Sequence, residues 1–391
     1  MTHVGIDLEQ FVTDPYRSGI QRVLQQLALS WPSNIATAEF VVPRGNAYLL
    51  LTPIEAASLI GLAFNVDADS AKREVVDARL ADLAGSAPTL QPAGLLSYFD
   101  AWLLPEVSYL PEVLDRFALF HSCLPAAMIA FDALPMTHPA NYRFTPSQES
   151  NVSRYFRLLS TCDAAICISD YSRHSLLVDL KRDARLVTTV AHPGGDHVEA
   201  KHQRHQAKDS PIRFLRLGTM ESRKMPVEIA QAFTASGVHR ERATLTFVGK
   251  PSASDPEINR ALQELVAANI GVTWFTDASD EEVREHMANA DVFLSFGVEG
   301  FGIPVLESLR LGVPVLYSGI QPAAVLMEGS GAAQVDTTAP GSLSEIFREF
   351  TSRESLHALA GTVAPDRVPR WEAFAHDVAR TVTDLTWPAS R

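Results

Sequence analysis

The fold of this chain is decided by one stretch of sequence, Asp291-Val-Phe-Leu-Ser-Phe-Gly-Val-Glu-Gly-Phe-Gly-Ile-Pro-Val-Leu-Glu307. It opens with a short apolar run that is typical of a buried strand. Gly300 and Gly302 follow, and Pro304 stands where the first turn of a helix tolerates a residue without an N–H group. The stretch therefore predicts a strand at 291–295, a glycine-rich turn and a helix at 303–310.

The same turn has the residue types of a site for a phosphorylated ligand. Gly300 and Gly302 let the backbone approach a ligand closely, and the free N–H groups at the helix start would face a diphosphate. Glu299 in the turn and Glu307 inside the helix can accept hydrogen bonds from sugar and ribose hydroxyls. The structural alternative is a strand–turn–helix corner in which Glu299 is solvated.

Outward from this stretch, short apolar runs alternate with helical patterns, which predicts an α/β fold with parallel sheets. In the second half we expect strands at 212–217, 244–248, 272–275, 291–295 and 313–317, and helices at 225–235, 256–267, 279–288, 303–310, 341–351 and 371–386. In the first half we expect strands at 3–7, 38–42, 101–104, 117–121, 127–131, 164–168 and 186–190, and helices at 20–30 and 149–160. Residues 53–96 are expected to be helical and rich in loops.

Composition limits the function. The net charge of −13 argues against a nucleic-acid partner, because neutralising phosphates requires a basic face. No apolar run has the length of a membrane span, and the N-terminus is typical of a first strand rather than a signal peptide. Three cysteines without metal-ligand spacing indicate a reducing, cytoplasmic compartment.

Residues 193–211 are polar and lack apolar periodicity, which predicts an interdomain linker. Three histidines fall within it: His197, His202 and His205. We expect them to be solvated, and ligation of a metal is the alternative.

A second motif, Phe214-Leu-Arg-Leu-Gly-Thr-Met-Glu-Ser-Arg-Lys224, follows that linker. It predicts a strand, a turn at Gly218 and two adjacent cations before a helix. A departing diphosphate needs positive charge, which Arg223 and Lys224 can supply without a metal. A solvated surface pair is the structural alternative.

Three weaker motifs lie in the first half: Arg17-Ser-Gly-Ile-Gln-Arg22, Met128-Ile-Ala-Phe-Asp-Ala-Leu-Pro135 and His192-Pro-Gly-Gly-Asp196. Gly19 in the first is compatible with an anion at a helix start. Asp132 in the second lies at the carboxyl end of an expected strand, where ligand crevices form in such sheets.

Together these motifs resemble those of the family 4 glycosyltransferases. Glu299 to Glu307 is similar to the signature E-G-F-G-x-P-x-x-E, and Leu311-Gly-Val-Pro-Val315 is similar to the turn that follows it in the family. The loop at Gly218 resembles the family's phosphate-binding sequence G-T-x-E-x-R-K. The third weak motif resembles the family's P-x-G-x-D. The chain departs from the family at Phe131, where members commonly carry histidine before the acidic residue.

The resemblance implies a role for each matching residue. Glu299 would contact the donor sugar and Glu307 the nucleotide ribose, while Arg223 and Lys224 would hold the diphosphate. Asp132 matches the family's acidic position and joins Glu299, Arg223 and Lys224 as a catalytic candidate. The remaining donor-binding candidates are Gly19, Gly218, Thr219, Gly300, Phe301, Gly302 and Ile303.

The resemblance also implies the GT-B architecture, two Rossmann-like, doubly wound parallel-sheet domains facing a central cleft. We expect an acceptor-binding domain at 1–195, a linker at 196–211, a donor-binding domain at 212–370 and a helix at 371–391 that crosses back to the first domain.

The implied reaction moves a sugar, with retention of configuration, from a UDP- or GDP-sugar to a saccharide or lipid-linked saccharide. We expect no cofactor, no metal, no nucleic acid and at most peripheral membrane contact. Two alternatives stay open: a non-catalytic partner subunit of the same fold, and an epimerase or phosphorylase of the same fold.

Overall fold

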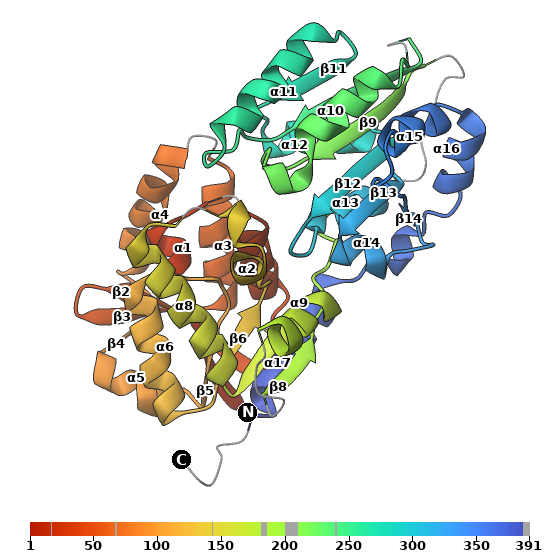
Figure 1. The fold of residues 1–391 in the computed structure, drawn as a ribbon. Helices are drawn as coiled ribbons and strands as arrows, with labels where there is room; N and C mark the ends of the chain where they lie inside the picture. Colours follow the sequence, from red (N-terminus) through yellow and green to blue (C-terminus); the bar gives the residue numbers. More distant parts are fainter. Residues whose placement is uncertain are drawn as a thin grey trace. The chain divides into compact units, whose positions relative to one another are not determined.

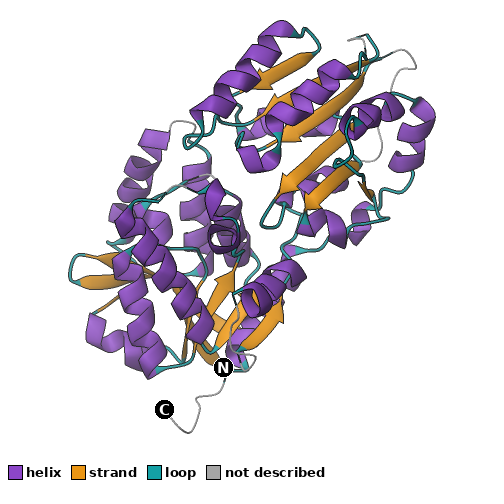
Figure 2. Cartoon of the chain, viewed as in Figure 1, coloured by secondary structure: helices purple, strands orange, loops and turns teal. Residues whose placement is uncertain are grey.

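The computed structural model of the protein describes residues 1–16, 18–66, 69–142, 144–180, 186–199, 210–238 and 241–385. The chain divides into two compact units (Figure 1). Unit 1 comprises Met1–Pro139, Phe144–Gly194 and Arg370–Arg391, and unit 2 comprises Ala140–Arg143 and Gly195–Pro369. In both units helices flank a sheet (Figure 2).

Unit 1 is built on an eight-stranded sheet in the order β4-β3-β2-β1-β5-β6-β7-β8. Its strands are β1 (Thr2–Asp7), β2 (Ala36–Arg44), β3 (Ala47–Leu51), β4 (Thr89–Leu90), β5 (Ala101–Leu104), β6 (Ala126–Ala130), β7 (Ala164–Cys167) and β8 (Val187–Val190). From β2 to β8 all neighbours are parallel, whereas β3 and β4 add an antiparallel edge.

The helices of unit 1 are α1 (Glu9–Thr13), α2 (Gly19–Leu29), α3 (Pro53–Phe64), α4 (Asp69–Leu83), α5 (Pro92–Tyr98), α6 (Pro111–Cys123), α7 (Leu134–Thr137), α8 (Pro146–Thr161), α9 (Asp170–His174) and α17 (Trp371–Thr383). A π-helical turn at Ser175–Asp179 follows α9. The last helix, α17, buries Trp371 and Phe374 within this unit.

Unit 2 has a six-stranded parallel sheet in the order β11-β10-β9-β12-β13-β14. The strands are β9 (Ile212–Leu217), β10 (Ala243–Val248), β11 (Val272–Phe275), β12 (Val292–Val298), β13 (Val315–Ile320) and β14 (Ala332–Gln334). The helices are α10 (Pro226–Ala235), α11 (Pro256–Ala268), α12 (Asp280–Asn289), α13 (Ile303–Arg310), α14 (Pro322–Leu326), α15 (Ser342–Phe350) and α16 (Arg353–Ala360).

The strand order of each sheet fixes where a ligand would bind. In unit 2 the chain leaves β9 toward β10 on one side and resumes at β12 on the other. Open parallel sheets bind ligands at the carboxyl ends of the strands, at the point where the order reverses. In unit 2 that point is the end of β9 and β12, and in unit 1 it is the end of β1 and β5.

Most of the expected elements are present, but one strand prediction is wrong. Residues 117–121 lie inside α6, whose buried residues include Val113, Leu114, Phe117 and Phe120. These positions recur at helical spacing, and Pro111 starts the helix. The short apolar run is therefore one face of a helix. The predicted linker lies mostly outside the described residues, since 200–209 are not described.

Candidate active site

The first element of the site is the turn after β9. Gly218 has φ +114°, and a Cβ added there would lie 2.9 Å from Lys224 Nζ. The turn runs into a short 3₁₀ helix, Ser222–Lys224. Met225 then takes the left-handed conformation, with φ 58°, before Pro226 starts α10. This sharp reversal sets Arg223 and Lys224 beside the carboxyl end of the sheet.

Close backbone packing holds this turn against β12. Gly297 in β12 has φ +90°, and a Cβ there would lie 2.0 Å from the carbonyl oxygen of Arg223. Its partner in β13, Gly319, has φ +79°, and its Cβ would lie 2.2 Å from the carbonyl oxygen of Gly297. Only glycine fits such contacts at positive φ. Neither glycine is among the residues that the sequence analysis singled out.

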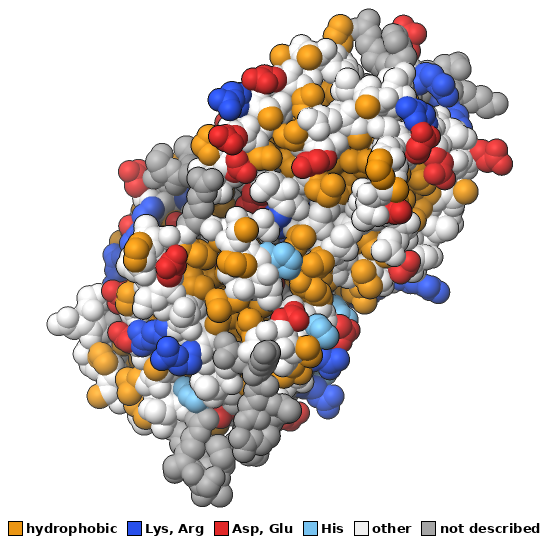
Figure 3. Space-filling model, viewed as in Figure 1, with side chains coloured by type: hydrophobic (Ala, Val, Ile, Leu, Met, Phe, Trp, Pro, Cys, Tyr) orange, Lys and Arg blue, Asp and Glu red, His pale blue; other side chains and the backbone are white. Residues whose placement is uncertain are grey.

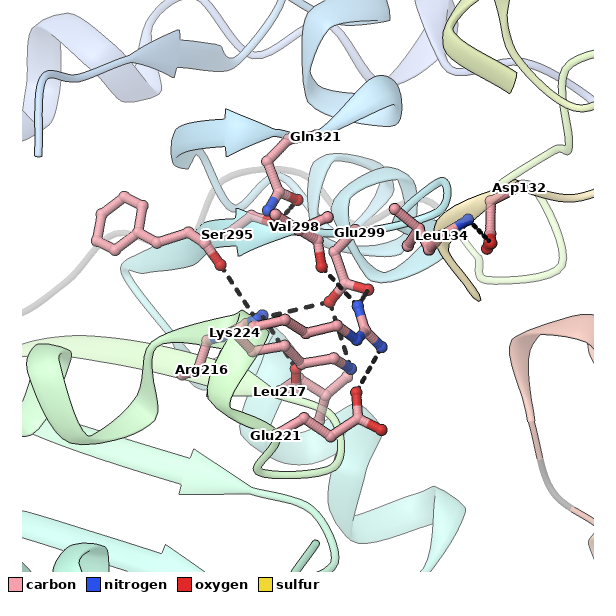
Figure 4. A network of polar contacts seen from close by, with 12 residues as sticks. Asp132, Leu134, Arg216, Leu217, Glu221, Lys224, Ser295, Val298, Glu299 and Gln321 are labelled. Carbon is pink, nitrogen blue, oxygen red and sulfur yellow. Dashed lines mark hydrogen bonds and ion pairs between the residues drawn. The ribbon is translucent and has the colours of Figure 1, made fainter. Parts of the chain in front are cut away.

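Glu299 sits at the centre of a cluster of cations (Figure 4). Its Oε1 lies 3.3 Å from Lys224 Nζ and 3.6 Å from Arg216 Nη2. Its Oε2 accepts a hydrogen bond of 3.0 Å from Arg223 Nη1. Arg223 also pairs with Glu221 at 2.5 Å. The structure thus brings together three of the four predicted catalytic residues, and Glu299 is not the solvated side chain of the structural alternative.

Charge balance sets the ionisation of this cluster. Burial would raise the pKa of Glu299, but Lys224, Arg223 and Arg216 outweigh burial and hold that pKa at about 2. Burial lowers the pKa of Lys224 and of Arg216. Three cations face two carboxylates, those of Glu299 and Glu221, so the cluster carries one net positive charge. An anionic ligand would balance that charge.

Arg216 is the member of the cluster that sequence analysis missed. Its side chain is 3% exposed, although it belongs to the apolar strand β9. An arginine in a buried strand is rare unless it is paired. An arginine within an apolar strand was therefore the available signal. Its partner, Glu299, is 83 residues away in sequence and follows a different strand.

The turn after β12 leads into α13. Gly302 caps this helix with φ 101°, and Glu299 N–H donates to the carbonyl of Ile320 at 2.8 Å. Phe301 and Ile303 have buried side chains. Pro304 has no N–H group and the Val305 N–H donates to the carbonyl of Gly302 at 3.0 Å. A ligand at the start of α13 would therefore meet the backbone N–H groups that precede Pro304.

Glu307, one turn inside α13, lies 2.7 Å from a histidine: its Oε1 contacts Nε2 of His197. The side chain of His197 is 10% exposed and that of Glu307 is 17% exposed. The expectation that His197 is solvated is therefore wrong, because the chain after Gly195 packs against α13. His202 and His205 lie outside the described residues.

A polar pocket adjoins the cluster in unit 2. Its lining includes the 3₁₀ helix and the loop that follows β10: Ala140, Asn141, Glu221, Ser222, Arg223, Ser252, Ser254 and Asp255. The residues after β10 were not predicted as part of a site. Their serine hydroxyls and the Asp255 carboxylate offer hydrogen-bonding groups beside the phosphate-binding candidates.

The candidates in unit 1 have local structural partners. Asp132 Oδ1 accepts a 2.9 Å hydrogen bond from Leu134 N–H at the start of α7. Phe131 is 4% exposed, and its carbonyl accepts from Ser172 Oγ at 2.5 Å. Gly19 opens α2, which Ser18 caps by accepting from Gln21 N–H.

Within the described part of the chain, no three His, Cys, Asp or Glu side chains gather as a metal site would require. No helix of that part is long and apolar enough to span a membrane. On the face drawn in Figure 3, Lys and Arg side chains are interspersed with acidic ones.

Known proteins resemble this chain in part of its sequence and in its fold. Residues 197–362 match the family model described as Glycosyl transferases group 1. The fold is that of the GT-B glycosyltransferases, which confirms the expected α/β fold class.

Two solved structures resemble this chain in fold, and one curated protein matches part of its sequence. Anabaena Alr3699/HepE, solved in complex with UDP and glucose, is 13% identical with a TM-score of 0.66, covering 98% of this chain and 100% of that one. WaaG, a glycosyltransferase involved in lipopolysaccharide biosynthesis, is 15% identical with a TM-score of 0.59, covering 98% and 100%. The serotype-specific mannosyltransferase WbdA of Escherichia coli is 31% identical over 182 residues, 45% of this chain and 20% of WbdA. The chain spans about a fifth of the length of such curated relatives.

Proposed function

We propose that the protein is a glycosyltransferase that moves a sugar from a UDP- or GDP-sugar to a saccharide or lipid-linked saccharide, with retention of configuration. The observation that carries this proposal is the cluster around Glu299. It places a net positive charge at the switch point of the unit 2 sheet, in the unit that contains the whole matched region.

The donor would bind through groups that the geometry supplies. Arg223, Lys224 and the N–H groups at the start of α13 would hold the diphosphate. Glu307 would accept hydrogen bonds from the ribose, and Glu299 from the donor sugar. The polar pocket beside Arg223 would receive another part of the nucleotide.

The reaction would proceed on one face of the sugar. The bond from the anomeric carbon to the diphosphate oxygen breaks, and its electron pair passes to that oxygen. The acceptor hydroxyl forms its bond to the same face of the carbon, and its proton passes to the departing phosphate. Arg223 and Lys224 stabilise the negative charge that develops there, so we propose that no divalent metal is required.

A non-catalytic subunit is the second candidate, and the buried Phe131 favours it, because family members commonly place histidine there. The remaining expectations belong to the main proposal: unit 1 binds the acceptor with Asp132 beside it, the protein acts in the cytoplasm, and membrane contact is at most peripheral.

The proposal is tested with a panel of UDP- and GDP-sugars and saccharide acceptors, each incubated with the purified protein in excess chelator. We expect acceptor-dependent release of one nucleoside diphosphate, and a product whose anomeric configuration by NMR equals that of the donor. Binding of a nucleoside diphosphate without turnover of any donor would favour the non-catalytic subunit. Release without acceptor would favour an epimerase-like enzyme.

A further inference from the structure

The pair formed by His197 and Glu307 has no place in the proposed function as stated above. Glu307 is the candidate ribose ligand, and its Oε1 lies 2.7 Å from His197 Nε2. Both side chains are largely buried, at 17% and 10% exposure. A carboxylate oxygen only accepts hydrogen bonds when ionised, so the histidine donates through a protonated Nε2.

The backbone is shaped to deliver His197 to this position. Gly195 N–H donates to the carbonyl of Pro369 at 3.0 Å. A Cβ on Gly195 would lie 2.7 Å from both Leu306 Cβ and Val368 Cγ1. Glycine therefore lets the chain touch α13 one residue before Glu307. A turn follows, in which Val198 N–H donates to the carbonyl of Gly195 at 3.4 Å.

The contact with His197 affects how readily Glu307 can bind a ligand. A glutamate on a helix has three rotatable bonds, and ordering it on ligand binding costs conformational entropy. A hydrogen bond to one carboxylate oxygen holds the group in place before the ligand arrives. The second oxygen, Oε2, then remains to accept from a ribose hydroxyl.

We infer that His197 is a positioning residue that orients the Glu307 carboxylate and thereby sets selectivity for ribonucleotides over deoxyribonucleotides. The inference rests on the proposed function, because it assigns Glu307 to the ribose. In this assignment His197 acts on the ligand through the Glu307 carboxylate.

The test compares His197→Ala, His197→Gln, Glu307→Ala and the double variant with the native protein. His357→Ala is the matched control, since His357 is an exposed histidine of the same unit. Calorimetry measures the affinity of each for UDP and GDP and for their 2′,3′-dideoxy analogues. Thermal unfolding establishes that each variant is folded.

We expect His197→Ala to weaken ribonucleotide binding about threefold to tenfold, the cost of ordering one glutamate side chain on binding. The dideoxy analogue should bind native protein and His197→Ala within about twofold, because it has no hydroxyl for Glu307. His197→Gln keeps a donor nitrogen and should retain most of the native affinity. This variant keeps the test decisive if His197→Ala does not fold. The double variant should bind the ribonucleotide no more weakly than Glu307→Ala does.

Three outcomes would overturn the inference. Equal losses for both ligands would give His197 a general structural role, and tighter ribonucleotide binding by His197→Ala would make it a competitor of the ribose. Unchanged affinity of His197→Ala for both ligands would remove its role. If Glu307→Ala also keeps full selectivity, or the native protein shows none, the ribose assignment in the proposed function fails as well.

Discussion

Replacing Glu299 with glutamine removes the negative charge from the cation cluster while keeping the shape of the side chain. The pKa of Glu299 falls from an ordinary 4.5 to about 2 because Lys224, Arg223 and Arg216 outweigh the effect of burial. One pKa unit corresponds to about 1.4 kcal/mol, so folding stabilises the charged form of Glu299 over its neutral form by roughly 3 kcal/mol relative to the unfolded chain. Glu299→Gln should lower the free energy of unfolding by about that amount.

The change also leaves three cations facing one carboxylate, that of Glu221. The cluster would then carry two net positive charges instead of one. Removing one partner of a buried ion pair is costly for this reason. A nucleoside diphosphate should therefore bind Glu299→Gln at least as tightly as it binds the native protein.

The assay is urea-induced unfolding at pH 7, with Glu349→Gln as the control. Glu349 is an exposed glutamate in the same unit, and its substitution should cost less than about 0.5 kcal/mol. Because the folded pKa of Glu299 is depressed, its contribution is fully present above pH 4.5 and is lost as pH falls toward 2. The deficit of Glu299→Gln should thus be constant from pH 8 to about 5.5 and shrink below 4.5. A deficit equal to that of Glu349→Gln would refute the reasoning.

Three further predictions concern other parts of the molecule. Burial and Asp7 raise the pKa of Glu106 from 4.5 to about 8, so its contribution to stability is present below pH 4.5 and lost as pH rises through 8. In thermal unfolding, the free energy of unfolding of Glu106→Gln should rise relative to that of the native protein by up to about 1.4 kcal/mol per pH unit between pH 5 and 8. A difference that stays constant with pH would contradict this. Gly297→Ala should lower stability by more than about 2 kcal/mol, because its Cβ would meet the Arg223 carbonyl at 2.0 Å. Gly237→Ala, also at positive φ but in open space, is the control and should cost about 1 kcal/mol; equal losses would argue against close packing. Donor turnover should survive excess chelator, and a loss restored by manganese or magnesium would show that Arg223 and Lys224 do not suffice.

The local elements were predictable because their signals are local. The apolar strand before Glu299, the glycine turn and Pro304 predict β12 and α13 as observed, and helix and strand order follow from the same patterns. The error at 117–121 arose where a short apolar run fits both a strand and one face of a helix.

The contacts that complete the site were not predictable, because they join residues distant in sequence. Arg216 reaches Glu299 and His197 reaches Glu307 only once the chain has folded. The polar sequence around His197 is typical of a linker, and only Gly195 hints at close packing. The roles of the candidate residues in binding and turnover stay predictions.

The most direct test of the central claim is calorimetric titration of UDP and GDP into native protein and Glu307→Ala, beside donor turnover. The account predicts that one nucleotide binds the native protein and that the folded variant binds it about tenfold to a hundredfold more weakly, since a charged acceptor is lost. Turnover at low donor concentration should fall in proportion. Absence of nucleoside diphosphate binding by the native protein, or equal affinity in Glu307→Ala, would contradict the claim.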